Sequence, residues 1–108
     1  MTHRVIVRFR AGPTWEPGGP VREQPGWAAH AAFVYALVEQ GTLVMGGPYS
    51  DNSGTMMLLE GVDAAEAERI LADDPFIENR VFLLEEIREW TIFVDELTEG
   101  RPNREAPP

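Results

Sequence analysis

The chain has 108 residues, contains no cysteine and carries a formal net charge of -9 at pH 7. One domain near the usual size accounts for this length, and the lack of cysteine excludes disulfides, thiolate metal ligands and cysteine nucleophiles. The acidic excess makes nucleic acid and acidic membrane surfaces unfavourable partners, because both carry negative charge. All nine basic residues are arginine, which excludes chemistry at a lysine amine.

The first predicted element is a strand over residues 4–10, in which apolar and charged residues alternate with a period of two. Residues 12–26 are dense in glycine and proline and predict a long loop; loops longer than about 12 residues in compact domains are often functional. A helix is then expected between Pro25 and Gly41, because apolar residues recur every three or four positions. His30 lies on or beside this apolar stripe.

Two short strands are expected next. Residues 42–45 form the first, which we expect to end at Gly46-Gly47-Pro48. Residues 51–54 have the composition of a turn, and residues 55–59 form the following strand.

The last third of the chain predicts a helix and a strand. Asp63 and Glu66 have the spacing of a capping box, so a helix starts there and ends before Asp74-Pro75. Residues 81–94 are largely apolar and predict a strand, which the acidic pair Glu85-Glu86 would bulge or break in two.

The order strand, helix, strand, strand, helix, strand predicts an α+β fold of the ferredoxin-like βαββαβ type with an antiparallel sheet. Its two helices can cover one face, so the face that carries Ile6 needs another cover, and a twofold homodimer is the simplest one. We expect residues 1–95 to form this domain and residues 96–108 to be a flexible, polar, proline-rich tail.

A set of short motifs occurs in a fixed order. They are His30-Ala31-Ala32-Phe33, Leu37, Gly41, Leu43, Gly47-Pro48, Glu66-Ala67, Asp74-Pro75-Phe76 and Trp90. From about Val5 to Val94 this order resembles the YCII family. The resemblance implies a ferredoxin-like fold that pairs into a dimeric α+β barrel, and an active site made of His30 and Asp74. It also implies lyase or isomerase chemistry on small cyclic molecules, because one characterised relative removes chloride from a chlorinated hydroxyquinol and related barrels include muconolactone isomerases.

A paired histidine and aspartate suit proton transfer, because an imidazole can take or give a proton near neutral pH and a carboxylate can orient it. The leading hypothesis is a cofactor-independent lyase or isomerase in which His30 is the general acid/base and Asp74 orients it. No metal or cofactor is expected. The residues expected to bind the substrate are Arg8, Trp27, Gly47, Pro48, Tyr49 and Ser50.

Other readings of the same residues stay open. His30 can be a packed helix residue satisfied by a backbone carbonyl, and Asp74 can cap a turn before Pro75. The whole chain can then be a non-catalytic module that binds a small molecule, or an assembly partner within a biosynthetic or catabolic pathway. The sequence has no apolar run of transmembrane length and its first ten residues lack a signal-peptide core, so we expect a cytoplasmic protein.

Overall fold

The computed structural model describes residues 2–99. Along the chain the elements are β1 (Thr2–Ala11), the 3-10 helix η1 (Val21–Glu23), α1 (Trp27–Glu39), β2 (Leu43–Pro48), β3 (Gly54–Leu59), α2 (Ala64–Leu71), α3 (Pro75–Glu78), β4 (Phe82–Ile92) and α4 (Glu96–Glu99). The four strands form one sheet in the order β2-β3-β1-β4, and each neighbouring pair is antiparallel. The predicted ferredoxin-like α+β fold is confirmed.

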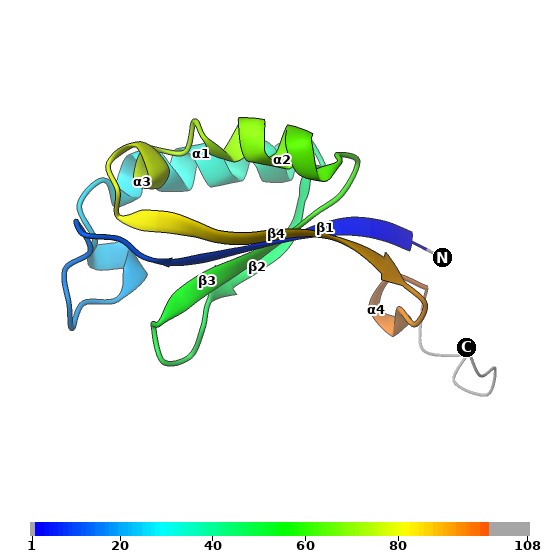
Figure 1. Cartoon of the computed structure of the whole chain (residues 1–108), viewed down its shortest axis with the longest axis horizontal. Coiled ribbons are helices and arrows are strands. Elements are labelled where there is room, and N and C mark those ends of the chain that lie inside the picture. The colour runs from blue at the N-terminus through cyan, green and yellow to red at the C-terminus, as the bar shows by residue number, and fades with distance from the viewer. Residues whose placement is uncertain (1, 100–108) are drawn as a thin grey trace.

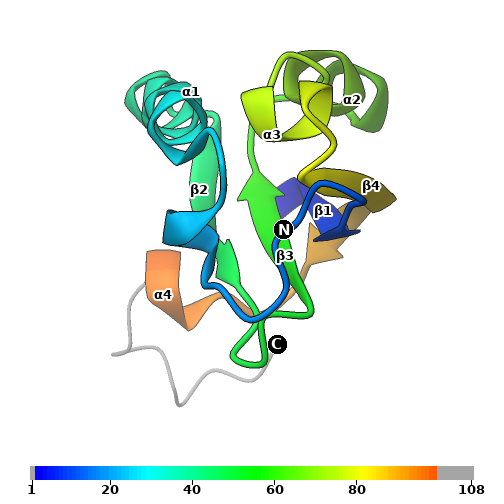
Figure 2. The same cartoon turned by 90° about the vertical axis from the view of Figure 1, so that its left-hand side faces the viewer.

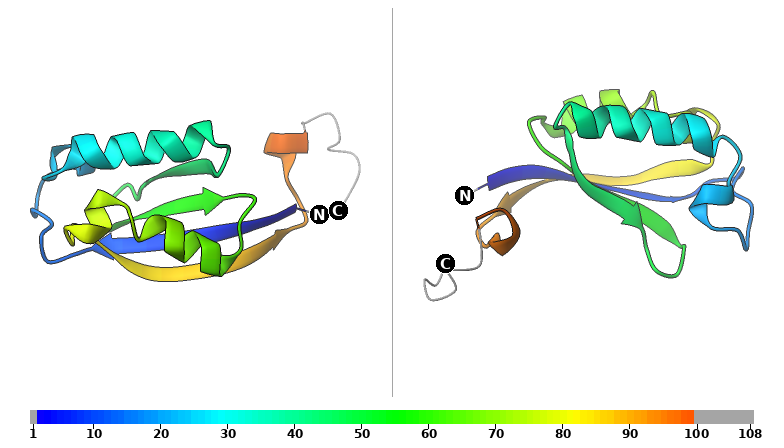
Figure 3. Two further views of the ribbon diagram at one scale, coloured as in Figure 1. Left: turned by 90° about the horizontal axis from the view of Figure 1, so that it is seen from above. Right: turned by 180° about the vertical axis from the view of Figure 1, so that it is seen from behind.

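The core lies between the sheet and the helices α1, α2 and α3, which all cover the same face (Figure 1). Alternation along β1 turns Val5, Val7 and Phe9 toward these helices, and none of the three is more than 1% exposed. Helix α1 lies over β2, while α2 and α3 lie on the β4 side (Figure 2). From above, α1 and α2 run side by side across the sheet (Figure 3).

The predicted disturbance at the acidic pair in the last strand is a bulge. Arg8 of β1 lies opposite Glu86, whereas the next residue, Phe9, lies opposite Leu84, so Glu85 is the extra residue. A bulge of this kind bends one strand without ending it. β4 therefore continues as a single strand instead of breaking into two.

The predicted end of the second strand at Met45 is wrong, because β2 continues through Gly46 and Gly47 to Pro48. β2 is an edge strand, so a proline there does not interrupt a ladder between two neighbours. The following turn is held by Asp51, whose carboxylate accepts hydrogen bonds from the backbone N–H and the hydroxyl of Ser53. These bonds lower the pKa of the Asp51 carboxyl below its usual range.

The helix α2 begins as predicted, with the Asp63 carboxylate accepting the backbone N–H of Glu66 at 2.8 Å. The short helix α3 was not predicted. It begins immediately after Asp74 because proline is favoured at the first helical position and the aspartate side chain caps the free N–H groups.

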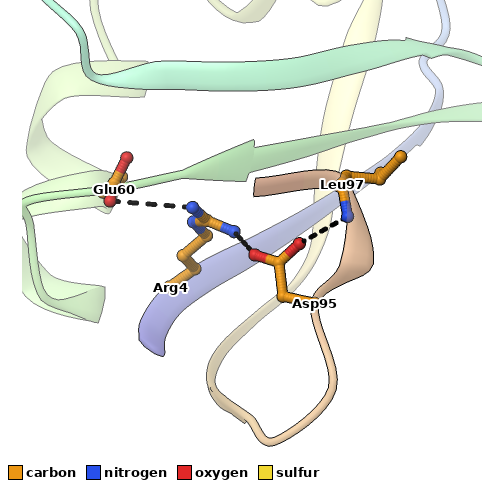
Figure 4. A network of polar contacts seen from close by, with 4 residues as sticks. All are labelled: Arg4, Glu60, Asp95 and Leu97. Atoms are coloured by element: carbon orange, nitrogen blue, oxygen red, sulfur yellow. Dashed lines mark hydrogen bonds and ion pairs between the residues drawn. The ribbon is translucent and has the colours of Figure 1, made fainter. Parts of the chain in front are cut away.

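The opposite face of the sheet carries the C-terminal segment near one end (Figure 1). Figure 4 shows Arg4 of β1 between two acidic side chains, with Nη1 3.2 Å from Asp95 Oδ2 and Nη2 3.7 Å from Glu60 Oε1. Asp95 also accepts the backbone N–H of Leu97. Arg4 therefore ties the start of α4 to the centre of the sheet. Of the predicted tail, residues 96–99 form α4 and residues 100–108 lie outside the described residues.

Within residues 2–99, none of the helices has the length and apolar character that a membrane-spanning helix needs.

Candidate active site

His30 is positioned by the first turn of α1. Gly26 precedes the helix with φ of 85°, a left-handed conformation that glycine adopts without the penalty that a Cβ would bring. Its carbonyl accepts the backbone N–H of His30 at 3.0 Å, which fixes the start of the helix relative to the histidine. The side chain of His30 points inward and is 5% exposed.

Asp74 reaches the same point from the other half of the chain. It is fully buried, and its Oδ1 accepts the backbone N–H of Phe76 at 2.9 Å, which caps α3. The two oxygens of this carboxylate lie 2.8 and 3.0 Å from Nδ1 of His30. The two residues are therefore in direct contact, as the sequence motifs imply.

This contact decides which ring nitrogen of His30 carries the proton. An ionised carboxylate can only accept hydrogen bonds, so Nδ1 donates to Asp74. In the neutral ring the other nitrogen, Nε2, then has a free lone pair. Within residues 2–99 no group hydrogen-bonds to Nε2. The arrangement leaves Nε2 as the atom that can take a proton.

Three aromatic rings hold the imidazole of His30. Phe76 stacks on it with ring centroids 4.0 Å apart and 5° between the planes. Phe82 meets it edge-on at 5.8 Å, and Trp27 is tilted against it at 5.5 Å. Because stacked and edge-on contacts prefer defined orientations, these neighbours restrict rotation of the ring.

A cavity of about 500 Å³ lies between α1, the β2–β3 side of the sheet and the 12–26 loop, and His30 forms part of its wall. The other lining residues are Pro20, Val21, Arg22, Trp27, Ala31, Val34, Tyr35, Leu43, Gly46, Gly47, Pro48, Asn52, Thr55, Met57 and Phe82. Small-molecule sites are typically apolar cavities of this size with a few polar groups.

Of the residues expected to bind a substrate, Trp27, Gly47 and Pro48 line this cavity. The other three lie elsewhere, and substrate binding by them stays an untested prediction. Arg8 is next to Val7 and Phe9 on β1 and so points to the opposite face of the sheet. Tyr49 and Ser50 belong to the turn after β2, where the Tyr49 backbone N–H bonds to Gly54.

Arg8 is instead part of an ion-pair group on that opposite face. Its guanidinium lies 3.2 Å from Glu86 and 3.7 Å from Glu85. Arg88 donates to the other oxygen of Glu86 at 2.6 Å. The hydrogen bond from Arg88, with the charges of Arg88 and Arg8, lowers the pKa of the Glu86 carboxyl from its usual 4.5.

A family model described as the YCII-related domain matches residues 9–91, more than three quarters of the chain. The chain belongs to the YCII-related family. The predicted membership is confirmed, and the match spans both His30 and Asp74.

Among solved structures, this YCII-related chain is similar to 5-chloro-2-hydroxyhydroquinone dehydrochlorinase from Burkholderia phenoliruptrix AC1100, in its complex with 2,5-dihydroxybenzoquinone. The sequences are 23% identical, the TM-score is 0.59, and the alignment covers 81% of this chain and 93% of the dehydrochlorinase. At this identity the similarity concerns the fold. Among curated proteins, none matches the sequence.

Several polar residues of the cavity in this YCII-related domain were not anticipated, namely Arg22, Tyr35, Asn52 and Thr55. The position of Thr55 could have been predicted from the sequence, because alternation in β3 places it on the same face as Met57, toward the helices. Arg22 lies in a loop whose path the sequence pattern does not specify. In the part of the chain that the structure describes, no three His, Asp or Glu side chains converge as they would around a metal ion.

Proposed function

We propose that this YCII-related protein is a cofactor-independent lyase or isomerase that moves a proton on a small cyclic molecule. The observation that carries the proposal is the position of His30: Nδ1 is bound to the buried Asp74 carboxylate, while Nε2 has no partner within residues 2–99 and the ring borders the cavity. A buried carboxylate–imidazole pair beside a partly open, largely apolar cavity is suited to general base catalysis.

In the proposed reaction, Nε2 takes a proton from a carbon or hydroxyl group of the ring. The electron pair of the broken bond moves into the ring. In a lyase the pair forms a double bond to the neighbouring saturated carbon, whose leaving group departs with its bonding electrons, and the imidazolium then gives its proton to the leaving group or to water. In an isomerase the imidazolium returns the proton to another atom of the ring. Asp74 stabilises the imidazolium that forms between these steps, and a positioned acid/base group of this kind contributes typically about 10²–10⁴-fold.

The nature of the substrate is supported by two independent features. The cavity of about 500 Å³ accommodates a small ring, and its wall includes the aromatic side chain of Trp27, whose flat face suits a planar ligand. The fold is shared with a dehydrochlorinase of 5-chloro-2-hydroxyhydroquinone, whose bound ligand, 2,5-dihydroxybenzoquinone, is also a small hydroxylated ring. Hydroxylated six-membered rings, with or without a halogen, are therefore the first class to examine.

The decisive experiment follows chloride release from 5-chloro-2-hydroxyhydroquinone, and exchange of ring hydrogens for deuterium in a panel of hydroxylated rings. The wild type is compared with His30→Gln, which keeps the polar character of the side chain and removes the base. We expect His30→Gln to lose at least about a hundredfold of the turnover. Undiminished turnover, with folding verified by circular dichroism, would reject the proposal. Tight binding without turnover across the panel would instead identify a binding module.

We further propose that two copies of the chain pair through the face of the sheet opposite the helices. Strand register places Ile6, Met45, Met56 and Trp90 on this face. Met45, Met56 and Trp90 are 51%, 41% and 45% exposed in the single chain. Exposed apolar side chains on one face of a sheet are typical of interaction surfaces, and here they alternate with the ion-paired residues Arg8, Glu86 and Arg88.

The cytoplasmic location stays a prediction from the sequence.

A further inference from the structure

The 12–26 loop is held in a defined shape by one buried side chain. Gln24 is 3% exposed, and its Oε1 accepts the backbone N–H of Glu16 at 2.7 Å. Its Nε2 donates to the carbonyls of Glu16, Gly19 and Pro20 at 3.1 to 3.4 Å. The oxygen and the nitrogen of the Gln24 side-chain amide are both hydrogen-bonded to the loop backbone. These bonds take the place of the backbone–backbone hydrogen bonds of a helix or sheet, which this irregular segment lacks.

The beginning of the loop is attached to the connection between α3 and β4. The hydroxyl of Thr14 donates to the Asn79 carbonyl at 2.6 Å, and the backbone N–H of Gly12 donates to Val81 at 2.8 Å. Trp15 then stacks on Phe82, which is itself in edge contact with His30. The loop is therefore a fixed part of the cavity wall, placed relative to the histidine through a chain of direct contacts.

The segment that Gln24 holds contributes an exposed basic residue, Arg22, to the lining of the cavity. Pro20, Val21 and Arg22 line it, and the Arg22 guanidinium has no ion pair or hydrogen bond within residues 2–99. Among the described residues that line the cavity, none is Asp or Glu. By contrast, Arg4 and Arg8 are both paired with carboxylates. Arg22 is thus a basic residue in the lining of a largely apolar cavity, and its charge has no partner among residues 2–99.

We infer that Arg22 is a specificity-determining residue that selects cyclic substrates bearing an anionic oxygen group, a carboxylate or a ring oxyanion. The guanidinium presents several N–H donors in a plane and matches such oxygens well. The net charge of -9 opposes the approach of anions in general, so a local cation is needed for one to bind. This inference deepens the proposed function and rests on the same cavity being the site.

The test compares two probes that differ in charge and little in shape, 2,5-dihydroxybenzoate and 2,5-dihydroxybenzamide. Binding is measured by calorimetry, and by NMR shifts of the backbone amides of Ala31 and Val34 in the cavity wall. In the wild type we expect the carboxylate to bind about fivefold more tightly than the amide, as suits a partly solvated charge-assisted contact. Arg22→Gln should remove this preference, and Arg22→Lys should keep part of it.

The matched control is Arg69→Gln. Arg69 is exposed on α2, away from the cavity lining, and its loss changes the net charge by the same amount. This variant should keep the preference for the carboxylate. The inference is overturned if Arg69→Gln weakens the preference as much as Arg22→Gln. It is also overturned if the wild type shows no preference, or if neither probe shifts the cavity amides at millimolar concentration.

His30→Gln separates this inference from the proposed function. If that variant keeps the carboxylate preference and loses turnover, both proposals are supported. If it keeps both, the proton-transfer proposal fails and the anion-selective cavity stands.

Discussion

The side chain of Phe76 stacks on the His30 imidazole at 4.0 Å, while its backbone N–H donates to the carboxylate of Asp74. One fully buried residue therefore fixes both members of the pair, the ring by contact with its face and the carboxylate by a hydrogen bond. Because Phe76 is in the first turn of α3, the position of this short helix sets the geometry of the site.

Phe76→Leu should impair activity more than it impairs folding. The backbone N–H to Asp74 remains, but the flat surface beneath the imidazole is lost, and the ring of His30 becomes free to tilt. We expect a stability loss of about 1–2 kcal/mol, typical of shortening a buried apolar side chain. The control is Phe33→Leu, which shortens a half-buried aromatic of α1 that packs against the core. Equal losses of turnover in the two variants would contradict a role for the stacking contact.

Asp74→Asn and Asp74→Ala separate the two roles of the aspartate. Asparagine is also a good helix cap, so Asp74→Asn should retain α3, whereas alanine should cost about 1 kcal/mol more through the lost cap. Both variants remove the charge that holds the proton on Nδ1. We expect both to lose turnover by about 10²–10⁴-fold. Nitrogen-detected NMR of the imidazole should show the Nδ1–H form in the wild type, and a wild-type ring protonated at Nε2 would contradict the assignment.

Glu86 makes a pH-dependent contribution to stability. Its carboxyl pKa is lowered in the folded chain, chiefly by the hydrogen bond from Arg88. A lowered pKa means that the contribution is complete above the usual value of 4.5 and is lost as the pH falls through the lower, folded value. Glu86→Gln should therefore be less stable than the wild type at neutral pH, with the gap closing in acid. Urea unfolding across this range measures it, and a stability gap that stays constant from neutral pH into acid would contradict this contribution.

Met56→Glu tests the proposed dimer. The side chain is 41% exposed on the sheet face opposite the helices, so a single chain can accept the charge, whereas a paired copy cannot. We expect the wild type to have the mass of a dimer by light scattering and Met56→Glu that of a monomer. Val38→Glu is the matched control, because Val38 is a comparably exposed apolar residue on α1. A monomeric wild type at micromolar concentration would reject the dimer.

Gln24→Glu tests whether the 12–26 loop is preformed. The variant keeps an oxygen to accept the Glu16 N–H but loses every donation from Nε2, and it places a second carboxylate oxygen next to backbone carbonyls. Hydrogen exchange at the Glu16 and Gly19 amides should accelerate. Both 2,5-dihydroxybenzoate and 2,5-dihydroxybenzamide should bind more weakly. Unchanged exchange would show that the anchors at Thr14 and Trp15 suffice to hold the loop.

The fold followed from the sequence because its determinants are local and periodic. The alternation around Val7, the helical stripe of α1 and the Asp63 cap each specify an element without reference to the rest of the chain. The C-terminal end of β2 could not be predicted in this way. Glycine and proline are tolerated in an edge strand, and whether a strand lies at the edge depends on the tertiary structure.

The site was predicted unevenly for a similar reason. His30 and Asp74 were found through motif order, and their contact is present. Strand parity puts Arg8 on the face opposite the helices, away from the His30 cavity, and its expected contact with a substrate stays an untested prediction. Arg22 was missed because its position depends on the bonds of Gln24, which link residues in a loop without any repeat.

The capping bond of Asp74 also bears on how relatives of this chain can change over time. The same oxygen that faces His30 holds the first turn of α3, so a chain that no longer needed the chemistry would still be selected to keep the aspartate for folding. His30 caps no helix: within residues 2–99 its side chain hydrogen-bonds to Asp74 alone, and its other contacts are the packing of its ring against Trp27, Phe76 and Phe82. In relatives that lose activity, we expect the histidine to be substituted before the aspartate. A relative that has the aspartate without the histidine would then keep the fold and lack the catalytic pair.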